Sequence, residues 1–105
     1  EVSFKVDGSG YVLLYSVNAL CELEDAFGKS ALVVAQELDD PKGVSVKALR
    51  TVFRCGLTDD RPEITDIEAG ALIDKLGIEH VGPLIGQAFT AAFPGAEDVD
   101  IEGKS

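Results

Sequence analysis

Few residues of this chain could carry acid–base, nucleophilic or metal chemistry. His80 is the only histidine, and Ser-His-Asp sites, Cys-His sites and most zinc sites all need one. It stands beside Glu79 in the first turn of an expected helix, and nothing near it in the sequence has the pattern of a nucleophile with an orienting group. We therefore interpret His80 as a surface or boundary residue and predict that the protein is not an enzyme.

Carboxylates are abundant, but their spacing does not match that of catalytic or metal sites. The acids between Glu22 and Asp25 lack the histidine or apolar cleft that tunes a general acid. Asp39-Asp40 and Asp59-Asp60 do not fit a calcium-binding loop. Asp7-Gly8-Ser9-Gly10 lacks the helix and Lys of a nucleotide site. We predict no catalytic, cofactor-binding or metal-binding residue, and no cofactor.

Cys21 and Cys55 are the only cysteines, and each lies in an apolar, helical pattern. There is no C-x-x-C spacing. Because Cys fills small apolar gaps well, we expect free, partly buried thiols in a reducing cytosol. One disulfide between the two remains an alternative, because spacing alone does not decide it.

Composition and charge narrow the class of partner. The 105 residues carry a formal net charge of −10, and 46% of them are hydrophobic, as in one globular domain. An acidic chain repels phosphate backbones and anionic lipid surfaces, which argues against nucleic-acid and membrane partners. Basic protein partners are favoured; alternatively, the charge serves only solubility.

The longest uncharged run and the two ends of the chain bear on membrane insertion and on the bounds of the domain. The run Val81–Ala96 is shorter than a membrane span and holds Pro83 and Pro94. We expect one globular domain over residues 1–96 and a flexible acidic tail over 97–105. The chain contains no Met and opens on Glu1, so we expect that its natural start is not included.

Alternation and capping signals predict the elements of an α+β fold. Residues 2–6 and 11–15 alternate around the turn Asp7–Gly10 and predict a β-hairpin. Ser or Thr caps, apolar periodicity and Gly stops predict five short helices after it. A capping box begins the fourth, where Thr65 stands three residues before Glu68. The expected helices cover residues 16–27, 30–38, 45–57, 65–76 and 79–93.

One charged residue falls within an apolar helical face. On a helical wheel Glu24 lies between Val17 and Leu20, and a carboxylate there needs a partner. Arg50 and Arg54 flank the apolar stripe of the third helix, one turn apart. We predict that Glu24 pairs with one of them. A structural ion pair that docks the two helices is the preferred interpretation, and a partner-binding role is the alternative.

Positive charge gathers in the middle of the chain. Five of the nine basic residues lie between positions 42 and 61: Lys42, Lys47, Arg50, Arg54 and Arg61. This polarity suits self-association, in which the basic patch of one molecule meets an acidic patch of another. Ordinary solvated faces are the alternative.

The fifth expected helix is uncharged from Val81 onward. Its broad apolar face includes Leu84, Phe89 and Phe93, while Gly82 and Gly86 on the other side permit close approach of a second helix. Helices that are apolar or small all round are normally buried. We expect this to be the central helix; alternatively, a partner covers its second face, which makes these five residues candidates for partner binding.

The stretch Ala19-Leu20-Cys21-Glu22-Leu23-Glu24-Asp25-Ala26-Phe27-Gly28 resembles the small tail proteins of gene transfer agents and prophages, a group related to phage tail assembly chaperones. Glu1-Val2, Asp7-Gly8, Cys55-Gly56-Leu57 and Ala88 to Phe93 extend the similarity over residues 1–93. Pro83 and the acidic tail depart from the pattern.

The resemblance implies a non-catalytic tail assembly chaperone or minor tail protein. Such a protein binds the tape-measure protein and assists assembly of the tail tube protein in the cytoplasm of the bacterial host. The alternative location is the finished particle. A self-assembling structural tail tube component, a homo-oligomer joined through hairpin edges, is the alternative. A small enzyme ranks third.

Overall fold

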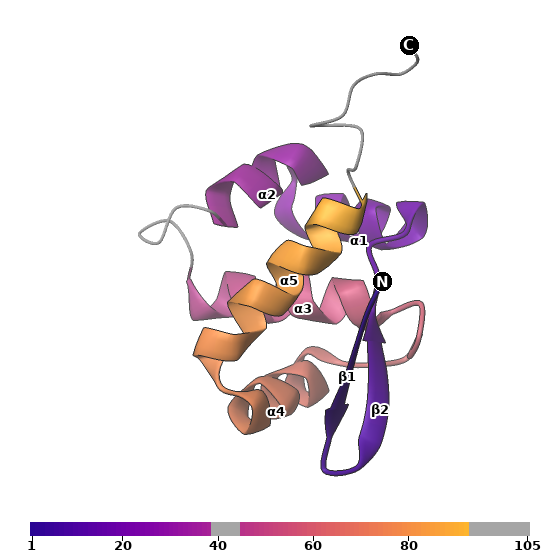
Figure 1. Ribbon diagram of the computed structural model, residues 1–105. Coiled ribbons are helices and arrows are strands. Elements are labelled where there is room, and N and C mark those ends of the chain that lie inside the picture. Colours follow the sequence, from indigo (N-terminus) through magenta and orange to yellow (C-terminus); the bar gives the residue numbers. More distant parts are fainter. Residues whose placement is uncertain (39–44, 93–105) are drawn as a thin grey trace.

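The N-terminal hairpin is confirmed, with a tighter turn than expected. The computed structural model describes residues 1–38 and 45–92 (Figure 1). Strand β1 (Val2–Val6) pairs antiparallel with β2 (Ser9–Leu13). Asp7 and Gly8 have φ values of 53° and 84°, as a two-residue type I′ turn requires. The second strand therefore begins at Ser9 rather than Tyr11, because Ser9 and Gly10 extend the ladder.

Five helices follow, which confirms the predicted α+β fold. Their N-terminal caps are those that the sequence predicted. Ser16 Oγ accepts from Ala19 N, Ser45 Oγ accepts from Ala48 N, and the capping box is complete. The helices are α1 (Val17–Phe27), α2 (Ala31–Leu38), α3 (Val46–Leu57), α4 (Asp66–Leu76) and α5 (Ile78–Ala92).

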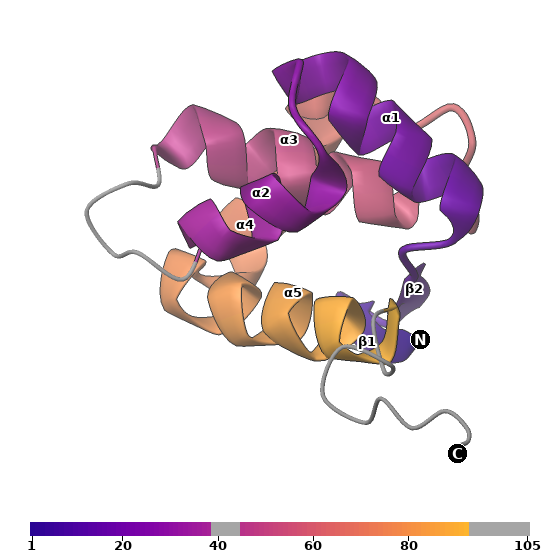
Figure 2. The ribbon, with the colours of Figure 1, turned by 90° about the horizontal axis from the view of Figure 1, so that it is seen from above.

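Helix α3 is the centre of the molecule. It packs against α1, α4, α5 and β2, and Figure 2 shows it between α1 and α5. Its Val52, Phe53 and Leu57 are fully buried. The expectation that the fifth helix is central is wrong: α5 packs with one side only, and Gly82 and Gly86 have open space where a side chain would stand. Sequence did not separate the two cases because an uncharged exposed face resembles a buried one.

The hairpin continues into a buried tyrosine that joins three elements. Tyr15 Oη donates to the carbonyl of Val52 at 2.7 Å. Its ring stacks on Phe89 of α5, with centroids 4.4 Å apart and planes 3° from parallel. Tyr15 therefore fixes the chain after β2 to both α3 and α5.

Helix α1 turns a different face to the core than the wheel predicted. Ala19 and Leu23 are buried and Leu20 is partly buried, whereas Val17 is 76% exposed. The core-facing side of α1 therefore contains Ala19 and Leu23, whereas Val17 and Glu24 are both exposed.

Two predictions concern parts of the chain outside the described residues. The candidate partner-binding residue Phe93 and the expected tail over 97–105 both lie there. Within the described ranges, none of the helices combines the length and apolar character that crossing a membrane requires.

Candidate functional site

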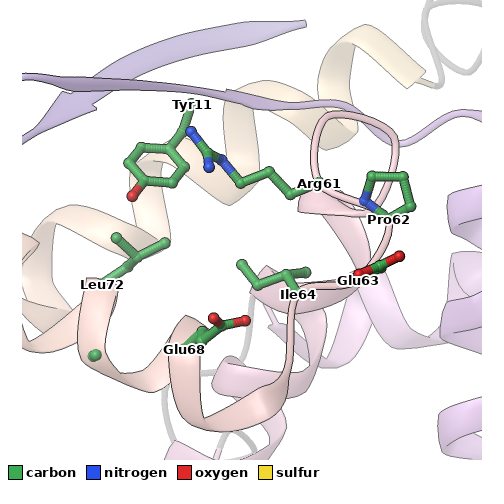
Figure 3. Close-up of a pocket in the computed structure, with 8 residues that line it drawn as sticks. Tyr11, Arg61, Pro62, Glu63, Ile64, Glu68 and Leu72 are labelled. Carbon is green, nitrogen blue, oxygen red and sulfur yellow. The ribbon is translucent and has the colours of Figure 1, made fainter.

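An open groove runs between the hairpin and helix α4, with a volume of about 660 Å³ (Figure 3). Three segments form it: β2, the α3–α4 connection and α4. Its lining combines an aromatic ring, aliphatic side chains, a guanidinium and two carboxylates: Tyr11, Arg61, Pro62, Glu63, Ile64, Glu68, Ala71 and Leu72. A mostly apolar concavity with a few polar groups is the usual form of a binding site.

Ile67, which is not part of the lining, continues the apolar surface of this groove along α4. Ile67 is 79% exposed and lies one turn before the exposed Ala71. Neither belongs to the buried stripe of α4, which is Ala69, Leu72 and Ile73. A partner helix that filled the groove would also cover Ile67 and Ala71, in the manner of helix-in-groove recognition.

Asp60 and Arg61 fasten the connection to the outer edge of β2. Asp60 Oδ2 accepts from Val12 N at 3.2 Å, and Arg61 Nη2 donates to the carbonyl of Gly10 at 2.9 Å. The Arg61 guanidinium carbon lies 4.1 Å from the centroid of the Tyr11 ring, a cation–π contact. We call this pair the Asp60–Arg61 clasp. It holds the groove's two walls together.

The predicted pairing of Glu24 with Arg50 or Arg54 is wrong. Glu24 is exposed, and its Oε2 accepts from Ala31 N at 2.8 Å. The carboxylate thus caps the N-terminus of α2, where helix N–H groups favour negative charge. Because Ala19 and Leu23 form the core-facing side of α1, Glu24 contacts the start of α2 rather than an arginine of α3.

The two arginines of α3 have other neighbours. Arg54 Nε lies 2.6 Å from Asp66 Oδ1, so this pair joins α3 to the first residue of α4. The alkyl chain of Arg50 lies against Gly70, and its Nε is buried without a hydrogen-bond partner in the described part of the chain. Lys42, a further member of the basic cluster, lies outside the described residues, and Arg61 belongs to the clasp.

The candidate partner-binding residues of α5 do not share one surface. Gly82 and Gly86 face outward, Leu84 is half-buried, and Phe89 is buried against Tyr15. Phe89 is therefore a core residue. The outward side of α5 stays exposed, but it brings no polar or apolar anchor to the groove.

His80 is exposed, and its Nδ1 lies 2.9 Å from the carbonyl of Leu76 and 4.0 Å from Glu79 Oε2. The imidazole thereby caps the last turn of α4. Glu68 of the groove accepts from Thr65 N in the capping box. Among residues 1–38 and 45–92, no three His, Cys, Asp or Glu side chains gather as a metal site would need.

A second depression, of about 400 Å³, lies between α1 and the end of α3. It contains Cys21, Glu22, Asp25 and Asp59 with Arg54 among them. Three carboxylates around one guanidinium make this surface acidic, which suits basic side chains of a protein partner.

Both thiols are free, as expected, but they differ in environment. Cys21 is exposed, whereas Cys55 is buried in the core. Burial raises the pKa of the Cys55 thiol to about 11; nearby Arg54 lowers it, and Glu22 and Asp66 raise it. Burial also raises the pKa of Tyr15 well above its ordinary value. A buried, protonated thiol is a poor nucleophile.

Reasoning from sequence missed the groove, because Tyr11 of β2 lies about fifty residues before the rest of the lining, which comes from residues 61–72. The one local signal was Ile67, an apolar residue off the buried stripe of its helix. The predicted Glu24 pair and the α5 set do not meet at this groove.

Comparison with known proteins gives no match: no family model, no curated protein and no solved structure matches the chain.

Proposed function

We propose that the chain is a tail assembly chaperone or minor tail protein of the phage type, which binds the helical tape-measure protein in the cytoplasm of a bacterial host and assists assembly of the tail tube. The resemblance over residues 1–93 names this role. The groove beside α4, continued by the exposed Ile67 and Ala71, is the observation that carries it.

The groove suits a helical partner because it is open and its lining combines apolar side chains with a few charged ones. Ile64 and Leu72 supply aliphatic surface, and Tyr11 adds an aromatic ring. Arg61 and Glu63 at the rim offer one charge of each sign. Helices bind such grooves through apolar anchors spaced one turn apart, and exposed apolar surface marks sites of this kind.

The hydrogen bonds along one edge of the hairpin favour a chaperone over a self-assembling tube component. Open-ended growth through hairpin edges requires two free edges. The outer edge of β2 is occupied by the Asp60–Arg61 clasp. Growth by strand addition is therefore blocked on that side.

Co-expression with the tape-measure protein of the same gene cluster tests the proposal. We expect a soluble complex, and we expect Ile67→Glu to reduce the amount of tape-measure protein that co-purifies by at least about tenfold, because it places a charge on the apolar contact surface. Val17→Glu is the matched control, since Val17 is 76% exposed on α1, away from the groove. Its complex should be unchanged.

Two outcomes contradict this proposal. One is an unaltered solubility of the tape-measure protein with no complex. The other is a complex that Ile67→Glu and Val17→Glu weaken equally, because binding would then not involve the groove.

A further inference from the structure

The two edges of the hairpin are not equivalent. On the outer edge of β2, Val12 N–H bonds Asp60, the Gly10 carbonyl accepts from Arg61, and further along Leu14 N–H bonds the carbonyl of Gly56 at 2.8 Å. Every second residue of an antiparallel strand points its N–H and C=O away from its neighbour. Residues 10, 12 and 14 are this outward set, and all three have partners.

On the outer edge of β1, the described part of the chain makes no such hydrogen bonds. The register pairs Val2 with Leu13, Phe4 with Tyr11 and Val6 with Ser9, and these residues bond inward because the even residues of β2 point outward. The N–H and C=O groups of Ser3 and Lys5 therefore point away from β2. Nothing in residues 1–38 and 45–92 hydrogen-bonds them, and both residues are exposed. Figure 1 shows β1 and β2 as the whole of the sheet.

The geometry points to a second copy of this chain as the occupant of that edge: we infer an antiparallel β1–β1 pairing about a two-fold axis at Ser3. In this register Ser3 lies opposite the second copy's Ser3, and Glu1 lies opposite the second copy's Lys5. The edge residues that point outward, at odd positions, then form the hydrogen-bonded pairs on both chains.

Side chains on both faces of the new sheet match in this register. Glu1 and Lys5 are exposed and in no ion pair with other described residues, so the two-fold creates two acid–base pairs. On the core side Val2 lies opposite the second copy's Phe4, and both are half-buried hydrophobic residues. Cross-strand pairs of these kinds stabilise a sheet. A shift of the register by two residues in either direction would remove both Glu1–Lys5 pairs, because Glu1 would then lie opposite the second copy's Ser3 or opposite its turn residue Asp7, which already pairs with Lys75.

The result is a closed dimer with a four-stranded sheet. An isologous contact uses the same patch on both chains and leaves nothing for a third. The clasp on each β2 prevents further strand addition. The inference does not depend on the tape-measure role, because it uses a different edge of the molecule and needs only the purified chain.

Charge reversal at the edge tests the register. In sedimentation experiments up to millimolar concentration, we expect a reversible dimer, and we expect Glu1→Lys or Lys5→Glu to weaken it about tenfold or more, since each places like charges opposite each other twice. The double variant Glu1→Lys/Lys5→Glu should restore the dimer. An equimolar mixture of the two single variants should form heterodimers. Lys47→Glu is the matched control for Lys5→Glu: it reverses an exposed Lys on α3, changes the net charge by the same amount, and should leave dimerisation intact.

A backbone test is independent of charge. Ser3→Pro removes an outward N–H but none of the bonds to β2, and edge strands tolerate Pro; it should yield a folded monomer. Amide exchange at Ser3 and Lys5 should slow as concentration rises. Three outcomes of the association experiments overturn the inference: a monomer at all concentrations, failure of the double variant to restore the dimer, and a dimer that survives Ser3→Pro. Amide protection at Ser3 and Lys5 that does not depend on concentration also overturns it, because the chain would then cover its own edge.

Discussion

At the scale of the residue, Gly56 shows how one missing side chain sets the position of a strand. A Cβ at this position would lie 2.6 Å from Leu13 Cδ1 and 2.7 Å from Tyr15 Cζ. The carbonyl of Gly56 also accepts from Leu14 N. The backbone of α3 thus contacts the end of the hairpin directly, and this contact brings Tyr15 into reach of Val52. The Gly-Leu step at 56–57 is a packing requirement.

We predict that Gly56→Ala lowers the free energy of unfolding by about 1–3 kcal/mol, because overpacking at a buried contact forces Leu13 and Tyr15 to move. Urea unfolding followed by circular dichroism measures this. Gly86→Ala is the matched control, since the added Cβ of that helical glycine would meet no atom within 4 Å apart from its chain neighbours and the backbone of its own helix. It should raise stability by up to about 1 kcal/mol. Equal effects of the two substitutions would contradict the close contact at Gly56.

Burial of Cys55 and Tyr15 makes stability depend on alkaline pH. In the folded chain burial raises the pKa of Cys55 from 9.0 to about 11, and it raises the pKa of Tyr15 well above 10.0. The folded state therefore keeps protons that the unfolded state releases. Under linkage this stabilisation is fully present below the unfolded pKa values and is lost as pH rises through the folded ones.

We predict that the free energy of unfolding falls as pH rises from about 9 to about 11. Urea titrations at a series of pH values measure the slope. In Cys55→Ala the thiol cannot titrate, so the decline should begin at a higher pH and be shallower. A wild-type stability that stays constant across this range would show that the two groups do not keep their protons on folding.

At the scale of the element, the sequence predicted the features that depend on residues close together in the chain and missed those that depend on distant ones. Ser16, Ser45 and the Thr65–Glu68 capping box were predicted because each cap depends on residues three positions apart in the chain. The hydrogen bond from Ala31 N to Glu24 was not predicted, because it depends on which face of α1 packs into the core. The core accepts the face with Ala19 and Leu23 and leaves Val17 exposed, which apolar periodicity alone does not reveal.

The candidate site illustrates the same limit. The clasp joins Asp60 and Arg61 to β2 across a separation of about fifty residues. In the sequence these two residues form part of an ordinary polar turn. The groove exists only once that turn lies along the hairpin, so no spacing rule could have predicted it.

The clasp predicts a specific pattern of backbone protection. Asp60→Ala removes the acceptor of Val12 N–H, so amide exchange at Val12 should accelerate by about tenfold or more as the edge becomes solvated. Leu14 N–H is an internal control, because it bonds the carbonyl of Gly56 and should stay protected. Exchange measured by NMR distinguishes the two amides. Equal acceleration at both would indicate general destabilisation rather than a released edge.

At the scale of the whole molecule, excess negative charge is the dominant feature. The formal net charge is −10, and four of the cations are already paired within the described chain: Lys29, Arg54, Arg61 and Lys75. Acids such as Glu22 and Asp25 are exposed and without an ion pair among the described residues. The electrostatic potential around the protein is therefore negative. It attracts basic partners, and repulsion among the acids destabilises the folded state.

This imbalance predicts that salt stabilises the protein. Between about 10 mM and 1 M NaCl the Debye length falls from roughly 30 Å to 3 Å, so repulsion among the excess acids is screened, and the free energy of unfolding should rise on the order of 1 kcal/mol. Urea titrations at the two ionic strengths measure it. The variant Glu22→Gln/Asp25→Asn has two fewer negative charges; it should be more stable than the wild type at low salt and gain less on adding salt. Loss of stability with salt would mean that pairs such as Arg54–Asp66 outweigh the repulsion, because screening weakens them instead.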